Sequence, residues 1–140
     1  MNDNLYVSIE LINDGMKFKS TVEGKPEIIT DYIPPYGDGR SVLPLELFLS
    51  SLGSCLGGAL SQILRKMRKQ VDGLAISVQG SRRSEHPTCF ESINLAIDLK
   101  SQDASVDDLR KALSLSEGIC PVWAMIDNKV AMEFTLNVSN

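Results

Sequence analysis

Hydrophobic and polar residues alternate along the first third of the chain. In LYVSIEL, apolar residues recur at every second position from Leu5 to Leu11, which is the pattern of a half-buried β-strand. The sequence Asn-Asp-Gly at 13–15 predicts a turn, and MKFKSTV alternates again, so we expect a β-hairpin. A third strand is predicted in PEIITDYI, and the Pro- and Gly-rich segment 34–39 that follows is expected to be an exposed loop.

The apolar spacing then becomes helical. Pro44 suits the first turn of a helix, because the N–H that proline lacks would have no partner there, and the predicted helix continues to about Gln70. One stripe of apolar positions follows helical spacing and consists of Phe48, Leu52, Cys55, Ala59 and Ile63. A second set of apolar residues widens this stripe: Leu45, Leu49, Leu56, Leu60, Leu64 and Met67. A helix apolar over so much of its circumference is expected to lie centrally or against a partner chain.

Small residues interrupt this helix in the segment SSLGSC, from Ser50 to Cys55. Gly53, Gly57 and Gly58 each weaken a helix by roughly 1 kcal/mol relative to alanine. Two explanations are open: a close approach of another element to the helix, or access of a reactant to the Cys55 sulfur.

The second half of the chain predicts strands around a second helix. LAISVQG and FESINLAIDL alternate as two strands, and VAMEFTLNV closes the chain as another. In SVDDLRKAL, Ser105 is the expected N-cap, with Asp108 three residues later in a capping-box relation, and Leu109, Ala112 and Leu113 on the buried side. CPVWAM begins a further helical turn at Pro121.

This order contains no regular strand–helix–strand alternation, so the predicted class is α+β. The N-terminal strands are antiparallel, a long central helix follows, and further strands flank a second helix. At 140 residues, the chain is expected to form a single domain over residues 1–140.

Composition narrows the classes of partner. The net charge of −4 and the pI near 4.9 argue against nucleic acid. The basic residues Arg65, Lys66, Arg68 and Lys69 fit a solvated helix end, where the helix dipole favours positive charge. No apolar run approaches the roughly 20 residues of a membrane span, and the N-terminus lacks a signal-peptide pattern. We therefore expect a cytoplasmic protein without a membrane partner.

Three cysteines at Cys55, Cys89 and Cys120 are too few and too far apart for a structural disulfide framework. Cys120 precedes Pro121 and is expected near a helix N-terminus, where the positive dipole end lowers a thiol pKa. Burial on the apolar stripe would raise the pKa of Cys55 unless a cation compensates. Each cysteine taken alone also fits a small buried hydrophobic residue. His86 and Cys89 supply only half a metal site, and further ligands at zinc-like spacing are absent from the sequence.

The surroundings of Cys55 and Cys120 resemble one family. PLELFLSSLGSC is similar to the motif that begins the long helix of OsmC/Ohr proteins, and CPVWAM is similar to their second cysteine motif. HPTCFESINLAIDL matches the strand that follows a His-Pro pair in that family. The resemblance covers nearly the whole chain, and the two cysteines have the order and separation that the family shows.

The resemblance implies an intertwined homodimer whose active sites contain residues of both chains. It also implies a thiol peroxidase, without cofactor or metal, that reduces organic hydroperoxides, and in some members hydrogen peroxide, as a stress response. Cys55 would be oxidised to a sulfenic acid, Cys120 would resolve it as a disulfide, and an external dithiol would reduce the pair. The small residues near Cys55 would then leave room for the peroxide.

Two further residues are candidates for this site by the same resemblance. Arg40 is the nearest substitute for the arginine that the best-known branch contributes from its early strands. Glu46 lies one position from that branch's glutamate and nine residues before Cys55. Nine residues correspond to half a turn beyond two full circles, so Glu46 would point away from Cys55. Three other roles are open for it: capping the helix start, binding elsewhere, or serving the other subunit.

A second hypothesis remains open on the same scaffold. The chain would then be a non-catalytic module that binds a small apolar or acyl ligand at the dimer interface. The position of Glu46, the lack of an early arginine and the many leucines favour this hypothesis, whereas the retention of both Cys55 and Cys120 favours the peroxidase. Metal binding by the two cysteines ranks last, because further ligands are lacking.

Overall fold

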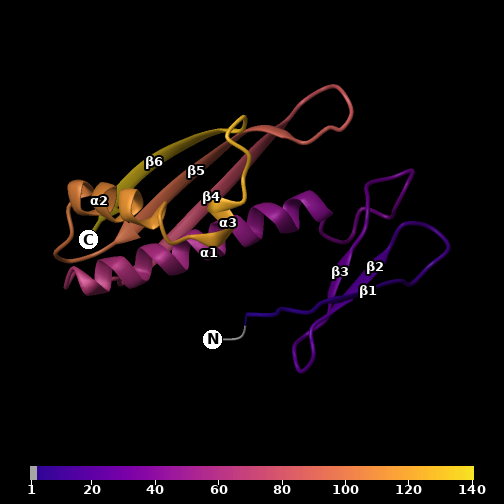
Figure 1. Ribbon diagram of the computed structural model, residues 1–140, viewed down its shortest axis with the longest axis horizontal. Coiled ribbons are helices and arrows are strands. Elements are labelled where there is room, and N and C mark those ends of the chain that lie inside the picture. Colours follow the sequence, from indigo (N-terminus) through magenta and orange to yellow (C-terminus); the bar gives the residue numbers. More distant parts are fainter. Residues whose placement is uncertain (1–2) are drawn as a thin grey trace. The chain divides into compact units, whose positions relative to one another are not determined.

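The computed structural model describes residues 3–140 of the chain (Figure 1). It divides into two compact units, one ending at Phe48 and the other comprising Leu49–Asn140. The elements in chain order are β1 (Ser8–Leu11), β2 (Phe18–Thr21), β3 (Ile28–Thr30), α1 (Pro44–Lys66), β4 (Gly73–Arg82), β5 (Phe90–Lys100), α2 (Val106–Ser116), α3 (Pro121–Ala124) and β6 (Ala131–Ser139). The predicted α+β class is confirmed.

The first unit contains an antiparallel sheet in the order β1-β2-β3. The predicted hairpin and third strand are confirmed, and Leu11 pairs with Phe18 next to the turn. The half-buried face expected for the first strand is not found in this chain, because every residue of β1 is exposed and Ile9 retains 61% of its accessible surface. The apolar residues of β1 are not covered by other residues of this chain. Exposed apolar surface of this kind is typical of a surface that contacts a partner.

The second unit contains a sheet in the order β4-β5-β6, with β5 antiparallel to β4 and parallel to β6. Alternate residues of β5 are buried on one face, namely Ile93, Leu95, Ile97 and Leu99, while the residues between them carry the polar side. Helices α1 and α2 lie along the sheet in Figure 1, and leucines of both helices belong to the same buried core. The unit is therefore a layer of helices on one face of a sheet.

Helix α1 begins at Pro44 as predicted but ends at Lys66 rather than near Gln70. Arg68 has a positive φ of 64°, its N–H donates to the Arg65 carbonyl, and the Lys69 N–H donates to the Leu64 carbonyl. This pair of hydrogen bonds is the Schellman helix stop. Glycine usually occupies the left-handed position. Here an arginine occupies it, so no residue before Gly73 marks the end of the helix in the sequence.

Two of the three helix glycines lie against strand β4. A Cβ built on Gly53 would lie 3.0 Å from Cγ2 of Val78, and one on Gly57 would lie 3.4 Å from Cδ1 of Ile76. A Cβ on Gly58 would meet nothing within 4 Å. Close approach of the helix to the sheet therefore accounts for Gly53 and Gly57. The second explanation, access of a reactant to the Cys55 sulfur, stays open for Gly58 alone.

Helix α1 is also long and apolar enough, by length and composition, to cross a membrane. The expectation that no segment reaches this length is wrong, because only uncharged residues lie between Glu46 in the first turn and Arg65 in the last turn, and the serines and glycines among them add little polarity. The core helix of a soluble protein meets the same criterion. Since Leu52, Leu56 and Leu60 of α1 are fully buried in the core, this helix is weak evidence for a membrane span.

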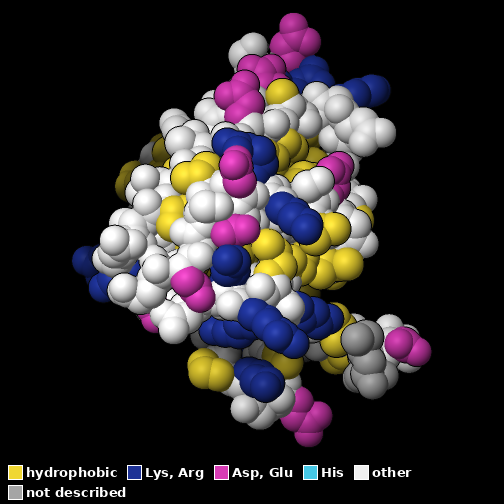
Figure 2. Space-filling model, turned by 90° about the vertical axis from the view of Figure 1, so that its left-hand side faces the viewer, with side chains coloured by type: hydrophobic (Ala, Val, Ile, Leu, Met, Phe, Trp, Pro, Cys, Tyr) yellow, Lys and Arg dark blue, Asp and Glu magenta, His cyan; other side chains and the backbone are white. Residues whose placement is uncertain are grey.

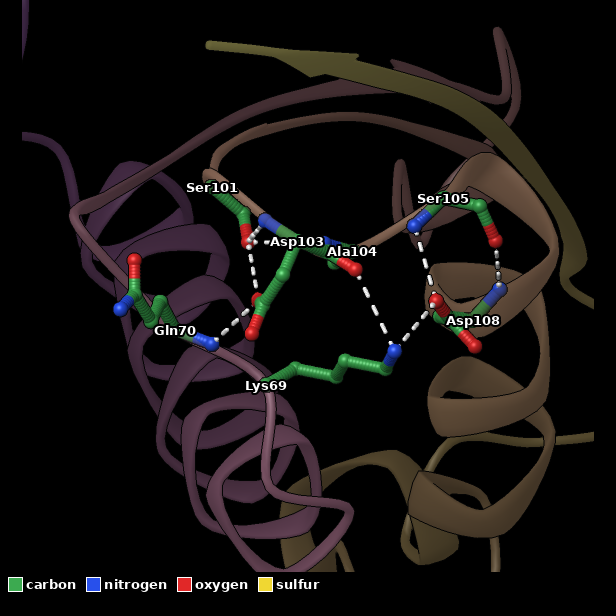
Figure 3. A network of polar contacts seen from close by, with 7 residues as sticks. All are labelled: Lys69, Gln70, Ser101, Asp103, Ala104, Ser105 and Asp108. Atoms are coloured by element: carbon green, nitrogen blue, oxygen red, sulfur yellow. Dashed lines mark hydrogen bonds and ion pairs between the residues drawn. The ribbon is translucent and has the colours of Figure 1, made fainter.

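A polar network joins the end of α1 to the start of α2 (Figure 3). Lys69 Nζ donates to the Asp103 carbonyl at 3.2 Å and lies 3.5 Å from Oδ2 of Asp108. Asp108 also accepts from the Ser105 N–H, and Ser105 Oγ accepts from the Asp108 N–H. The predicted capping box is confirmed, and it fixes the N-terminus of α2, the helix that leads to Cys120.

Basic side chains gather over part of the side of the molecule shown in Figure 2. Acidic side chains lie between and around them. The side shown in Figure 2 therefore carries charges of both signs.

Candidate active site

The structure brings two of the predicted site residues together. Cys55 lies in the middle of α1 and Cys120 lies 65 positions later, yet the two sulfur atoms are 3.4 Å apart, with Cys120 Sγ donating to Cys55 Sγ. Both are free thiols. A disulfide requires about 2.05 Å between sulfurs, so the two thiols are in contact and need only a small movement to bond.

Cys120 is held at the N-cap of α3 and is almost completely buried, at 1% exposure. Its N–H donates to the Ser116 carbonyl at the end of α2, and its carbonyl accepts from the Ala124 N–H in the following turn. The predicted helix start at Pro121 is therefore confirmed. Both ends of the residue are fixed, so the thiol has a defined direction toward α1.

The pKa of the Cys120 thiol is raised, contrary to the expectation from its place at a helix N-terminus. Burial is the largest cause, because it penalises the charged thiolate, and the nearby Cys55 adds to it. Hydrogen bonds from the backbone N–H groups of Trp123 and Val122 act in the opposite direction. Removal from water thus outweighs the helix N-terminus at this position.

Cys55 is the more accessible of the two thiols. It is half-buried, and its neighbour Ser54 is exposed, with the Ser54 hydroxyl donating to the Ser50 carbonyl at 2.8 Å. The hydrogen bond of the Ser54 hydroxyl is therefore made within the helix itself. Gly58 has open space beside it. Cys55 therefore has small, exposed residues near it in α1, namely Ser54 and Gly58.

Aromatic residues behind Cys120 support the short helix α3. The rings of Trp123 and Phe134 lie with centroids 5.1 Å apart and tilted by 43°, an arrangement that aromatic pairs favour. This contact fastens α3 to β6. The Trp123 and Val122 N–H groups are partners of Cys120 that were not predicted from the sequence, although Pro121 at the first helical position was the signal for them.

Glu46 and Arg40 occupy the first unit and have local partners. Glu46 Oε1 accepts from the Leu43 N–H at 2.8 Å, which caps the first turn of α1, one of the three roles left open for it. The Arg40 N–H donates to Oδ1 of Asp38, whose Oδ2 accepts from Lys17 Nζ at 2.7 Å. Arg40 is therefore on an anchored loop. The catalytic roles of Glu46 and Arg40 stay predictions.

Cys89 is separate from the thiol pair in its setting. It is exposed and directly precedes β5, three residues after His86. Among residues 3–140, no group of three or more His, Cys, Asp and Glu side chains is placed to hold a metal ion.

The chain resembles known proteins over most of its length. Residues 37–135 match the family model for OsmC-like protein. Protein YhfA of Escherichia coli K12 is 29% identical over 96 residues, which cover 68% of this chain and 72% of that protein.

Solved structures share the fold. A hypothetical protein from Aquifex aeolicus superimposes with a TM-score of 0.84 at 28% identity, covering 99% of this chain and 98% of that one. An organic hydroperoxide resistance protein OsmC from Legionella pneumophila has a TM-score of 0.74 at 12% identity, covering 98% and 100%. At that identity the second likeness concerns the fold alone. With the family match covering well over half of the sequence, the chain belongs to the OsmC-like protein family.

Proposed function

We propose that this protein is a thiol peroxidase that reduces organic hydroperoxides through Cys55 and Cys120. The observation that carries the proposal is the 3.4 Å contact between the two sulfur atoms. A protein named for organic hydroperoxide resistance shares this fold, which supports organic hydroperoxides as the substrate class.

The difference in burial supports an assignment of the two roles. Cys55 is half-buried, whereas Cys120 is almost completely enclosed and has a raised pKa. Because the thiolate is the reactive form of cysteine, Cys120 is poorly suited to the first attack on a peroxide. Cys55 is therefore the peroxidatic residue, and Cys120 is the resolving residue.

The reaction proceeds in three balanced steps. The Cys55 thiolate attacks one oxygen of the hydroperoxide, the O–O bond breaks, and the alcohol leaves with a proton, which gives Cys55 sulfenic acid. Cys120 then attacks the sulfenic sulfur, water leaves, and a Cys55–Cys120 disulfide forms. An external dithiol reduces this disulfide by two thiol–disulfide exchanges and is itself oxidised.

Arg40 and Glu46 have proposed supporting roles in the same site. A guanidinium near Cys55 would favour its thiolate and polarise the peroxide bond. Arg40 is the candidate for that cation. Glu46 would help to orient it, in addition to capping α1.

We propose a cytoplasmic homodimer built from one OsmC-like domain over residues 1–140. Proteins of this family are generally dimers. The exposed apolar side chains of the first unit support the proposal, since Leu5, Tyr6 and Ile9 retain 61–90% of their accessible surface and a second chain would cover them.

The experiment treats the reduced protein with one equivalent of cumene hydroperoxide and maps its disulfides by peptide mass spectrometry. Formation of a Cys55–Cys120 bridge within seconds, with Cys89 still reduced, is the expected result. Cys120→Ser should accumulate Cys55 sulfenic acid, which dimedone traps, and Cys55→Ser should consume no peroxide. Thiols that stay reduced for minutes would refute the peroxidase and leave the binding of a small apolar or acyl ligand as the function to test.

A further inference from the structure

A cavity of about 450 Å³ lies between the β4–β5 loop and the segment that joins α3 to β6. Its size falls within the range of roughly 300–1,000 Å³ typical of small-molecule sites. It is formed entirely by residues of the second unit, and Cys55 and Cys120 are not among them. The proposed peroxidase therefore does not use it.

The cavity combines an apolar surface with charges of both signs. Phe90 and Val130 contribute apolar surface, and Arg83 and Lys129 supply positive charge. Negative charge comes from Glu85, Glu91 and Asp127. Cys89 adds an exposed thiol to the lining. A ligand that satisfies this set carries both an ammonium and a carboxylate group, because carboxylates accept from ammonium and Arg or Lys pairs with carboxylate.

The backbone on both sides of the cavity is fixed by hydrogen bonds. The Cys89 N–H donates to the Pro87 carbonyl, and the Cys89 carbonyl accepts from the Arg83 N–H at 2.9 Å. Arg82 Nε donates to the Thr88 carbonyl at 2.7 Å. These bonds hold the thiol in one place at the cavity, rather than on an unrestrained loop.

The opposite side is a tight turn. Asp127 Oδ1 accepts from the Lys129 N–H at 2.8 Å, and the Val130 N–H donates to the Asp127 carbonyl. The Lys129 side chain forms no ion pair among the described residues, while Arg83 pairs only with the exposed Glu85, at 3.7 Å. One cation is therefore unpaired, and the other is held by a long, solvent-exposed pair of small energetic value.

We propose that this cavity binds small zwitterionic disulfides, of the amino-acid or short-peptide type, and that Cys89 forms a mixed disulfide with them. The Cys89 thiolate attacks one sulfur of the disulfide, the S–S bond breaks, and the other half leaves as a thiolate that takes up a proton. The small disulfide is the oxidant. The protein gains one half of it, and a second thiol of the same class reverses the reaction.

The test compares glutathione disulfide, which is zwitterionic, with 2-hydroxyethyl disulfide, which is uncharged. Reduced full-length protein is incubated with each, and the modification of the Cys89 peptide is followed by mass spectrometry. Each rate is divided by the rate of the same disulfide with free N-acetylcysteine. We expect the normalised rate at Cys89 to be about tenfold higher for glutathione disulfide, the size of effect that complementary charges give to association.

Arg83→Gln combined with Lys129→Gln should abolish this preference, while Lys111→Gln, an exposed change on α2, should retain it. Equal normalised rates in the wild-type protein would overturn the proposal and leave Cys89 as a merely exposed thiol. A preference that survives in the double variant would overturn it as well, since the named cations would then not select the ligand. If the double variant does not fold, the wild-type comparison decides alone. Because the peptide map separates Cys89 from Cys55 and Cys120, this outcome is independent of the proposed peroxidase.

Discussion

Gly53 of α1 lies so close to Val78 of β4 that an added Cβ would approach the valine Cγ2 to 3.0 Å. Gly58, five residues further along the same helix, has no atom within 4 Å of the corresponding position. The same residue type thus serves close packing at one position and leaves open space at the other. Gly53, inside the SSLGSC segment, therefore has a packing role. Gly58, outside that segment, is the glycine that could serve access to Cys55.

The two glycines predict opposite responses to alanine. Gly58→Ala should raise the free energy of unfolding by up to about 1 kcal/mol, because alanine is the better helix former and nothing opposes its methyl group. Gly53→Ala gains the same helix propensity but crowds Val78, so it should be neutral or destabilising. Chemical denaturation of both variants measures the difference. A Gly53→Ala protein as stable as Gly58→Ala would show that the helix shifts freely over β4.

Gly80 of β4 predicts a larger loss. The Phe90 ring covers this position, and an added Cβ would overlap its Cε1 and Cδ1 atoms. Gly80→Ala must displace the ring, so the free energy of unfolding should fall by about 1–3 kcal/mol, as for other overpacked sites. Ser77→Ala, on the exposed face of the same strand, is the control and should change stability little. Thermal unfolding of both variants tests this, and an unchanged midpoint for Gly80→Ala would contradict the ring position.

The capping box of α2 predicts a loss of stability in acid. Hydrogen bonds from Ser105, above all from its backbone N–H, and the charge of Lys69 lower the pKa of Asp108. A carboxyl whose pKa is depressed on folding adds stability above its unfolded pKa, near 3.9, and loses it as the pH falls through the lower folded value. The stability difference between the wild-type protein and Asp108→Asn should therefore be largest at neutral pH and shrink below about pH 4.

Urea unfolding at pH 7 and at pH 3 measures that difference. Asp107→Asn is a matched control in the same helical turn, because Asp107 forms an exposed pair with Arg110 and no other ion pair within residues 3–140. If Asp107→Asn showed the same pH dependence as Asp108→Asn, net charge rather than the capping box would be its cause.

Local patterns predicted most of the elements, and tertiary contacts decided what the sequence did not show. Periodicity gave the strands and helices, and Ser105 and Pro121 gave two helix starts, because these features depend on neighbours in the chain. The end of α1 was missed because Arg68 adopts the left-handed conformation that glycine usually marks. The contact of Cys55 with Cys120 across 65 positions came from the family resemblance, since no local pattern encodes a distance between two helices.

The pKa of Cys120 was the case in which two local rules competed. A helix N-terminus lowers a thiol pKa and burial raises it, and the sequence showed only the first. Because Cys120 is only 1% exposed, the effect of burial is the larger one and the pKa of its thiol is raised. Depth in the core is a property of the complete fold, so this sign was not available from the residues around Pro121.

The raised pKa of Cys120 predicts a loss of stability in alkaline solution. The unfolded thiol ionises near pH 8.5, whereas the folded thiol holds its proton to higher pH. The unfolded state therefore binds fewer protons than the folded state above that value, and stability falls with rising pH until the folded thiol also ionises. Cys120→Ala should lose this contribution, so its stability should decline less between about pH 8 and pH 10.

Urea titrations of both proteins under reducing conditions measure the two slopes, with Cys89→Ala as the exposed-thiol control that should follow the wild-type curve. Parallel curves for the wild-type protein and Cys120→Ala would mean that Cys120 ionises alike in the folded and unfolded chains, which would also remove the argument that assigns the first attack on peroxide to Cys55.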